Sequence, residues 1–324
     1  MIVVTGGAGF IGSSTVWRLN KLGIRDIIIV DDLDSSDKWK NLVNLDYDDY
    51  LHKDIFINMV RSCNLPWKVD AIFHLGACSS TTERDAEFLM SNNAKYTIDL
   101  CKFAVNVGAR FINASSAATY GDGSLGFNDD IEIAQKLQPL NMYAYSKHLV
   151  DLWLIKNRLI SSVVSLKFFN VYGPNEYHKN SMRSVIYKAF EQIQKTGKVS
   201  LFRSNHPDYQ DGEQKRDFVY VKDCVELMIW FLNNKNINGI FNVGTGIART
   251  WNDLACSVFV AMGQQKNITY IDMPMELCGK YQNFTQANMS WLQKKDCPIK
   301  FCSIEDGIKD YVRNYLQMGN ASLS

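Results

Sequence analysis

A short apolar strand runs directly into three regularly spaced glycines at the start of the chain. Residues 2–4 read Ile-Val-Val, and Gly6, Gly9 and Gly12 follow in the spacing G-x-x-G-x-x-G, ahead of an apolar helix face. Missing side chains at these positions allow a tight turn, close approach of a pyrophosphate to the backbone, and close packing of helix on strand. The first N–H groups of the helix would face the phosphates. The run predicts a dinucleotide-binding turn, although an isolated glycine triplet is also typical of ordinary turns.

The next apolar run ends in two carboxylates. Residues 25–30 have the composition of a buried parallel strand, and Asp31 and Asp32 follow it. A carboxylate at this position binds ribose hydroxyls and repels a 2′-phosphate, which favours NAD. Lys38 and Lys53 could neutralise that phosphate and so favour NADP, although their spacing alone is typical of solvated surface lysines. The residues by themselves leave the choice of cofactor open.

Strands and helices alternate through the first half of the chain, and the pattern loosens after residue 170. Further strands are expected over 70–74, 110–114, 162–168, 216–221 and 239–244, and helices over 84–107, 141–160, 181–195, 222–235, 285–295 and 303–317. We expect the run 216–244 to return to the sheet as strand, helix and strand. The pattern predicts the α/β class, with a doubly wound parallel Rossmann sheet and a smaller mixed α/β substrate domain.

This reading divides the chain into two domains. We expect residues 1–169 plus about 217–245 to form the NADP-binding Rossmann domain, and about 170–216 plus 246–324 to form the substrate-binding domain. The ligand crevice should lie at the carboxyl ends of the parallel strands.

Charge and composition argue against several classes of partner. The 324 residues carry a formal net charge of +1 without a long basic run, so neither nucleic acid nor a membrane surface is an expected partner. No apolar stretch is long enough to span a bilayer. The eight cysteines show no C-x-x-C pair and no zinc spacing, so we expect no metal site and reduced thiols in a cytoplasmic protein.

A serine and a Tyr-x-x-x-Lys pair form the candidate catalytic group. Ser116 ends the strand from residue 110, and Tyr143 and Lys147 are four residues apart, so they share one helix face. The Lys147 ammonium should stabilise a phenolate, pulling the pKa of Tyr143 below its usual value of about 10, and could hold the nicotinamide ribose. Ser116 could hydrogen-bond the reacting oxygen. Tyr145 points elsewhere on the helix and is expected to be a packing residue.

Longer strings add a more specific resemblance. They are HLGACSSTTE at 74–83, ASSAATYG at 114–121, FNVYGP at 169–174, HKNSM at 178–182, KRDFVYV at 215–221 and YQNFTQ at 281–286. With the glycine motif and the Tyr-x-x-x-Lys pair, these strings resemble the ADP-L-glycero-D-manno-heptose 6-epimerase family of the extended short-chain dehydrogenases/reductases, over nearly the whole chain.

The resemblance implies an activity and an assembly. It implies conversion of ADP-D-glycero-β-D-manno-heptose to its L-glycero form at carbon 6, for the heptose of the lipopolysaccharide inner core. Carbon 6 is an unactivated carbinol, so inversion requires hydride removal and return through a 6-keto intermediate. The resemblance also implies tightly held NADP rather than NAD, and a homo-oligomer, with a pentamer as the expected form.

The same resemblance assigns site residues. Tyr143 and Lys179 would be the acid/base pair. Cofactor contacts would fall on Gly6, Gly9, Phe10, Ile11, Gly12, Asp31, Asp32, Lys38, Lys53, Leu75, Gly76, Ala77, Cys78, Ser79, Asn92, Lys147, Val171 and Lys179. Substrate contacts would fall on Asn170, Ser181, Lys188, Phe202, Arg203, Ser204, Asn205, Arg216 and Tyr281. Arg216 would clamp the pyrophosphate, or else form a structural ion pair.

Three other functions share these motifs. A sugar-nucleotide 4,6-dehydratase needs an acid just after the serine, where this chain has Ala117 and Ala118, which cannot donate a proton. Another sugar-nucleotide epimerase, acting at carbon 4 of a UDP-hexose, is disfavoured by Lys179 and the longer strings. A non-catalytic NADP-binding module is disfavoured by the intact set of Ser116, Tyr143 and Lys147.

Overall fold

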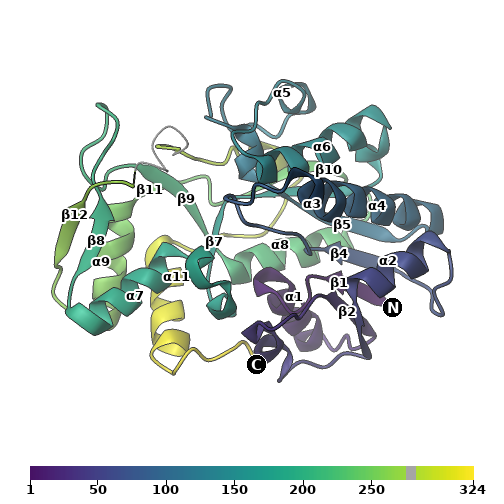
Figure 1. Ribbon diagram of the computed structural model, residues 1–324, viewed down its shortest axis with the longest axis horizontal. Coiled ribbons are helices and arrows are strands. Elements are labelled where there is room, and N and C mark those ends of the chain that lie inside the picture. The colour runs from purple at the N-terminus through teal and green to yellow at the C-terminus, as the bar shows by residue number, and fades with distance from the viewer. Residues whose placement is uncertain (275–281) are drawn as a thin grey trace.

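Seven parallel strands form the central sheet of the computed structural model, which describes residues 1–274 and 282–324 (Figure 1). The sheet has the order β10-β6-β5-β4-β1-β2-β3. Its strands are β1 (Ile2–Thr5), β2 (Ile27–Asp31), β3 (Asp49–His52), β4 (Ala71–His74), β5 (Arg110–Ser116), β6 (Val164–Phe168) and β10 (Gly239–Val243). The chain moves outward from β1 in one direction to β3 and in the other from β4 onward. This switch point, between β1 and β4, opens a crevice at the carboxyl ends of the strands. The predicted doubly wound parallel sheet is confirmed.

Helices cover both faces of the sheet. One face carries α1 (Phe10–Lys21) and α8 (Val221–Asn233), and the other carries α2 (Lys53–Arg61), α4 (Tyr96–Val107) and α6 (Met142–Lys156) (Figure 1). Successive strand residues alternate between the two cores: Val4 packs with the α1 side, and Val3 packs with the α4 side. Continuous apolar strands are therefore buried on both faces. Short α3 (Ala86–Leu89) leads through a π-helical segment, Met90–Lys95, into α4, and α5 (Ile131–Ala134) precedes α6.

A second lobe packs beside the sheet, on the left of Figure 1. Its strands are β7 (Asn170–Tyr172), β9 (Lys215–Tyr220) and β11 (Ala248–Thr250) in one small sheet, and β8 (Val199–Phe202) and β12 (Ile268–Ile271) in another. Its helices are α7 (Val185–Thr196), α9 (Trp251–Met262) and α11 (Ile304–Tyr311), the last continued by a π-helical turn to Leu316. The short α10 (Ser290–Gln293) instead packs against the core of the large sheet, beside β10. A separate apolar core joins α7, α9 and α11.

Three local expectations are wrong. The strand predicted over 216–221 does not join the large sheet: β9 lies between β7 and β11, and only β10 returns to the large sheet. The helix predicted over 285–295 is reduced to α10, because the Thr285 N–H donates to the carbonyl of Lys215 and ties this segment to β9. The helix predicted from 181 begins at Val185, after a 3-10 segment over Tyr177–Met182.

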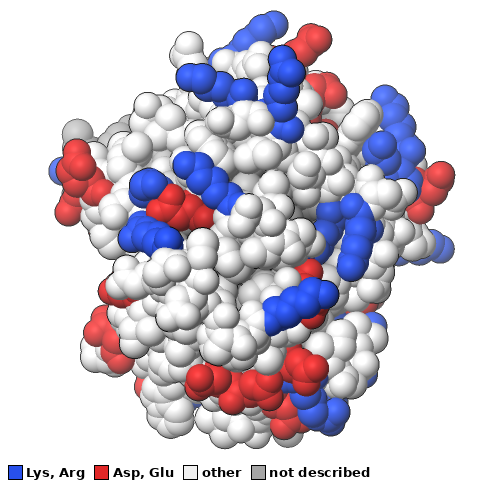
Figure 2. Space-filling view, turned by 90° about the vertical axis from the view of Figure 1, so that its right-hand side faces the viewer, with Lys and Arg blue, Asp and Glu red and all other residues white. Residues whose placement is uncertain are grey.

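Charged side chains of both signs cover the side on which α2 and α4 lie (Figure 2). Arg61 of α2 and Lys95 both contact Asp99 of α4, at 2.9 and 2.6 Å.

Within residues 1–274 and 282–324, no helix is both long and apolar enough to cross a bilayer.

Candidate active site

The turn between β1 and α1 forms a cradle that only glycine can line. Gly6 has a φ of +67°, and a Cβ there would lie 2.7 Å from the backbone of Gly76, at the end of β4. A Cβ on Gly12 would lie 2.0 Å from the carbonyl oxygen of Gly6. The two turns at the switch point therefore touch, and α1 begins at Phe10 with its N–H groups facing the crevice. This backbone geometry fits a dinucleotide pyrophosphate.

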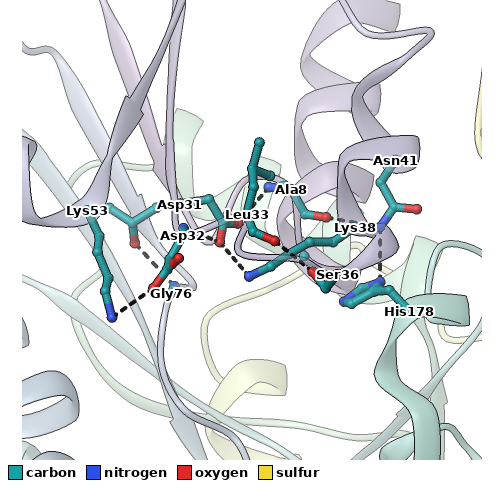
Figure 3. A network of polar contacts seen from close by, with 12 residues as sticks. Ala8, Asp31, Asp32, Leu33, Ser36, Lys38, Asn41, Lys53, Gly76 and His178 are labelled. Carbon is teal, nitrogen blue, oxygen red and sulfur yellow. Dashed lines mark hydrogen bonds and ion pairs between the residues drawn. The ribbon is translucent and has the colours of Figure 1, made fainter.

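Both carboxylates after β2 are paired with lysines (Figure 3). Asp31 accepts hydrogen bonds from the Ala8 N–H and from Lys38 Nζ, each at 2.9 Å, so it braces the glycine turn. Lys53 Nζ lies 3.3 Å from Asp32. Partial burial is the largest single influence on Asp32 and acts to raise its pKa, but the bond from Lys53 together with the charges of Lys53, His52 and Lys38 holds that pKa below its usual value. Two cations thus stand beside the carboxylates that would meet a ribose.

An asparagine pair holds the opposite wall of the crevice. Asn93 accepts from the Cys78 N–H at 2.9 Å and donates to the Cys78 carbonyl at 3.0 Å and to Ser146 Oγ at 3.1 Å. Its neighbour Asn92 accepts from Lys53 Nζ at 3.0 Å. The loop that follows β4 is therefore fixed to α6, the helix that carries Tyr143.

Ser116, Tyr143 and Lys147 meet at the floor of the crevice. Ser116 is the last residue of β5, and α6 begins one residue after Asn141, whose side chain caps the helix by accepting from the Ala144 N–H at 2.9 Å. Tyr143 and Lys147 are both buried, and Lys147 Nζ donates to the carbonyl of Ala114 at 2.7 Å. The serine, the phenol and the ammonium therefore come from two elements that are packed together.

The expected lowering of the Tyr143 pKa is wrong for this structure. Burial raises the pKa of Tyr143 above its usual value, and a hydrogen bond from Ser116 offsets only part of that rise. Burial also lowers the pKa of Lys147 to about 8, against the opposing charge of Asp151 one helical turn away. Desolvation dominates because both side chains lie against the sheet rather than in water.

A buried ion pair supports this group from behind. The Asp151 carboxylate accepts from Lys167 Nζ at 2.9 Å and from the hydroxyls of Ser115 and Ser165, each at 2.8 Å. Asp151 and Lys167 are fully buried. The pair joins α6 to β5 and β6 and so fixes the helix that carries Tyr143. Sequence reasoning missed it, because Lys167 and Asp151 carry no local motif.

Lys179 reaches the same crevice from the second lobe. It lies in the 3-10 segment after β7, and its Nζ lies 5.4 Å from the centre of the Phe10 ring. Burial lowers the pKa of Lys179, and the nearby Glu176 carboxylate opposes that change. The two groups of the expected acid/base pair thus approach from different lobes.

The crevice comprises two adjoining cavities. The larger, of about 750 Å³, is lined by Ser116, Tyr143, Lys147, Lys179 and Asn170. The smaller, of about 350 Å³, is lined by Asp32, Lys53 and Asn92. Every residue expected to contact the cofactor lines one or both cavities. Those that line the larger cavity are Gly6, Gly9, Phe10, Ile11, Gly12, Asp31, Lys38, Leu75, Gly76, Ala77, Cys78, Ser79, Lys147, Val171 and Lys179.

The expected substrate contacts are more scattered. Asn170 is the one of them that lines the larger cavity, while Tyr281 lies outside the described residues. Lys188 Nζ donates to the Ser181 carbonyl at 2.7 Å, so it holds the loop of Lys179. Arg216 is buried beside the Trp251 ring, 5.8 Å from its centre.

The segment at the end of β8 forms a turn stabilised by its own side chains. The Ser204 N–H donates to Asp211 at 2.9 Å, and Arg203 lies 3.7 Å from Asp272. Phe202 ends β8, and neither it nor Asn205 lines the two cavities.

Other residues line the larger cavity without having been singled out. They are chiefly Arg183, Phe218 and Trp251. Trp251 is the first residue of α9, 35 residues beyond Arg216 in the chain, and it is brought here by pairing of β11 with β9. No local pattern indicates such a residue.

Comparisons with known proteins show the family of the chain. The model of the NAD dependent epimerase/dehydratase family matches residues 2–244. The chain is 60% identical over 323 residues to an ADP-L-glycero-D-manno-heptose-6-epimerase of Nitratidesulfovibrio vulgaris, covering 100% of both chains. It is 46% identical to the enzyme of that name from Fusobacterium nucleatum, covering 98% of each. A crystal structure of the Helicobacter pylori ADP-L-glycero-D-manno-heptose-6-epimerase superposes with a TM-score of 0.80 at 27% identity, covering 97% of this chain and 95% of that one.

Proposed function

The chain belongs to the NAD dependent epimerase/dehydratase family and, within it, to the ADP-L-glycero-D-manno-heptose-6-epimerases, and from this membership we propose that it is an isomerase that inverts carbon 6 of ADP-manno-heptose. It converts ADP-D-glycero-β-D-manno-heptose to the L-glycero form, for the lipopolysaccharide inner core. The observation that carries the proposal is 60% identity along the whole chain to an enzyme of that name.

The protein's own groups would move protons and position the sugar. A bound nicotinamide supplies reversible hydride transfer, which an unactivated carbinol carbon requires. Tyr143 and Lys179 stand on different lobes, so each can exchange a proton with the C6 oxygen in one orientation of the terminal group. Ser116 would hydrogen-bond that oxygen, and Lys147 would hold the nicotinamide ribose. Both proton carriers are largely withdrawn from water, which limits loss of the 6-keto intermediate.

The cofactor we propose is NADP, with NAD as the alternative. Asp31 and Asp32 are each paired with a lysine, so their charges are balanced where a 2′-phosphate would lie. Lys38 and Lys53 would meet that phosphate. The remaining contacts are those of the glycine turn, the 75–79 loop, Asn92, Val171 and Lys179.

The two parts of the chain would divide the work. Residues 1–169 plus about 217–245 hold the cofactor, and about 170–216 plus 246–324 hold the substrate. Asn170, Ser181, Lys188, Arg216 and the 202–205 segment contact the ADP-heptose, as would Tyr281. Some of these side chains must move to reach it, since Lys188 is bonded to Ser181. The enzyme works in the cytoplasm as a homo-oligomer, a pentamer.

The decisive experiment incubates the purified protein with ADP-D-glycero-β-D-manno-heptose and follows carbon 6 by NMR. We expect the L-glycero epimer to form until the two epimers reach equilibrium, with no net change in cofactor redox state. Loss of water to a deoxy product would favour a 4,6-dehydratase. Turnover of UDP-hexoses alone would favour a carbon-4 epimerase, and no turnover would favour a binding module.

The choice of cofactor has a separate test. We predict that the protein purifies with NADP bound, because a redox-neutral cycle does not require the cofactor to leave. Denaturing the protein and identifying the released nucleotide by chromatography checks this. Recovery of NAD alone would mean that the carboxylate of Asp31 determines the choice of cofactor and that Lys38 and Lys53 do not recognise a 2′-phosphate.

A further inference from the structure

The loop that carries Lys179 is closed by one buried carboxylate. Glu176 stands immediately before the loop and is only 1% exposed. Its two oxygens accept from Ser184, at the far end of the loop: from the N–H at 2.5 Å and from the hydroxyl at 2.6 Å. The residues between them, 177–183, include His178, Lys179 and Ser181. A side chain that stands at one end of a seven-residue loop is thus bonded to the residue that follows its other end.

We propose that Glu176 is the positioning residue for Lys179: its carboxylate closes the loop that presents Lys179 to the cleft, and supplies a negative charge near the half-buried ammonium. The inference rests on the proposed function, since it concerns the proposed acid/base group. No motif considered in the sequence singles out Glu176.

The loop is anchored at its second end to a helix. The hydroxyl of Ser184 donates to Glu176 and accepts from the Tyr187 N–H at 3.2 Å, so Ser184 is the N-cap of α7. A carboxylate at this place also faces the positive end of the α7 dipole. The position of Lys179 is therefore coupled to a 12-residue helix packed in the core of the second lobe.

Further contacts prevent the loop from opening in the middle. The Lys179 N–H donates to the backbone carbonyl of Glu176 at 3.0 Å, and Lys188 Nζ donates to the Ser181 carbonyl at 2.7 Å. Asn180 has a φ of +47°, a conformation that the surrounding contacts must hold in place. The bonds between Glu176 and Ser184 are the members of this set that join one end of the loop to the other.

The charges around the pair are few. Glu176 is faced by Lys188 of α7 and by the phenols of Tyr177 and of Tyr311 of α11, and burial raises its own pKa. Lys179 is faced by His178 beside it and the ring of Phe10 of α1. Burial lowers the pKa of Lys179, and among the charges around it Glu176 opposes this change. Removing the carboxylate should therefore lower the pKa of Lys179 further, by about one unit, the lower end of the effect of a neighbouring opposite charge.

The test measures Lys179 directly and does not depend on turnover. The full-length protein is treated with trace acetic anhydride across a pH series, and acetylation of Lys179 is quantified by peptide mass spectrometry. Lys68, whose side chain is 87% exposed, is the internal reference. The midpoint of the pH profile of Lys179 acetylation should move to lower pH by about one unit in Glu176→Gln. It should stay at the wild-type value in Ser184→Ala, which removes bonds from the hydroxyl but keeps the charge.

Turnover gives the second readout. Glu176→Gln and Ser184→Ala should each reduce kcat about tenfold or more, because a small misplacement of a proton carrier is costly, with KM changed less. Glu176→Asp keeps the charge but is too short for both contacts. It should show reduced kcat with a midpoint closer to wild type than that of Glu176→Gln. If the melting curve shows that Glu176→Gln does not fold, the kcat values of Ser184→Ala and Glu176→Asp test the positioning role instead.

The outcomes separate the two proposals. If the wild-type protein does not invert carbon 6, the proposed function fails, while the acetylation midpoints still test the influence of the Glu176 charge on Lys179. If the wild-type protein is active and Glu176→Gln retains its midpoint, the positioning role is overturned. Wild-type kcat in both Ser184→Ala and Glu176→Asp would overturn it as well.

Discussion

At the scale of single residues, the proposed proton transfer depends on two side chains that reach the cleft from opposite lobes. Tyr143 and Lys179 line the larger cavity, as do the glycines of the turn between β1 and α1. We predict that Tyr143→Phe and Lys179→Met each reduce epimerisation by about 10²–10⁴-fold, the usual contribution of a positioned acid or base. NADP should remain bound in Tyr143→Phe, because its phosphates are held elsewhere. Initial rates by NMR and a fluorescence titration with NADP measure the two effects.

Tyr145 provides a matched control on the same helix. It is 43% exposed and does not line the cavities, so Tyr145→Phe should retain the wild-type rate. A near wild-type rate in Lys179→Met would contradict the two-base mechanism. Tyr143 and Lys147 would then act alone while the intermediate turns beneath them.

At the scale of elements, a neutral histidine joins β4 to its neighbours at the switch point. His74 Nδ1 lies 2.6 Å from the hydroxyl of Thr5 in β1, and its Nε2 lies 2.7 Å from that of Thr97 in α4. Burial, and then the charge of Lys147, lowers the pKa of His74 from 6.5 to about 3. A lowered pKa in the folded state stabilises the fold above pH 6.5, and this contribution is lost progressively as the pH falls from there toward 3.

His74→Gln should therefore change the pH dependence of stability as well as its magnitude. At pH 7 the variant should unfold more easily, by about 1 kcal/mol for each hydrogen bond lost. The difference from wild type should narrow between pH 7 and pH 5, because glutamine does not titrate. Urea unfolding at both pH values measures this. The control His206→Gln, at an exposed position, should keep the wild-type pH dependence of stability. If the difference in unfolding free energy between wild type and His74→Gln is the same at pH 7 and pH 5, the proposed contribution of the buried neutral His74 is refuted.

At the scale of the whole molecule, residues near the end of the chain join the two lobes. The Leu323 N–H donates to Asn175 Oδ1 at 3.0 Å, and the Trp17 indole of α1 donates to the Ser324 carbonyl at 3.1 Å. Leu323 is 1% exposed. We predict that Leu323→Ala lowers the free energy of unfolding by about 2–5 kcal/mol, the usual effect of truncating a buried leucine.

Chemical denaturation of Leu323→Ala and Met318→Ala tests this point. Met318 is 69% exposed in the same segment, so its truncation should change stability by less than about 0.5 kcal/mol. Equal effects in the two variants would mean that the segment does not support the contact between the lobes.

Local patterns predicted most of the large sheet and the core of the proposed site, whereas the family resemblance supplied most of the proposed cofactor contacts. Glycine spacing, apolar strands and a four-residue Tyr–Lys interval are short-range features, and Gly6, Gly12, Tyr143 and Lys147 follow from them. Each reflects steric limits or helix geometry within a few residues. The same patterns could not place β9, whose β7 and β11 partners lie more than 25 residues away on either side.

Sequence by itself determined the class of fold, the glycine cradle and the residue types that the chemistry needs, because backbone sterics and side-chain spacing act locally. Tertiary structure alone decided how those groups are held. It buried Tyr143 and raised its pKa, and it bonded Lys188 to the carbonyl of Ser181 in the loop of Lys179. It also brought Asp151 into contact with Lys167, and Glu176 into contact with Ser184. These outcomes depend on which surfaces pack together and exclude water, and neither desolvation nor a long-range partner is encoded in the neighbouring residues.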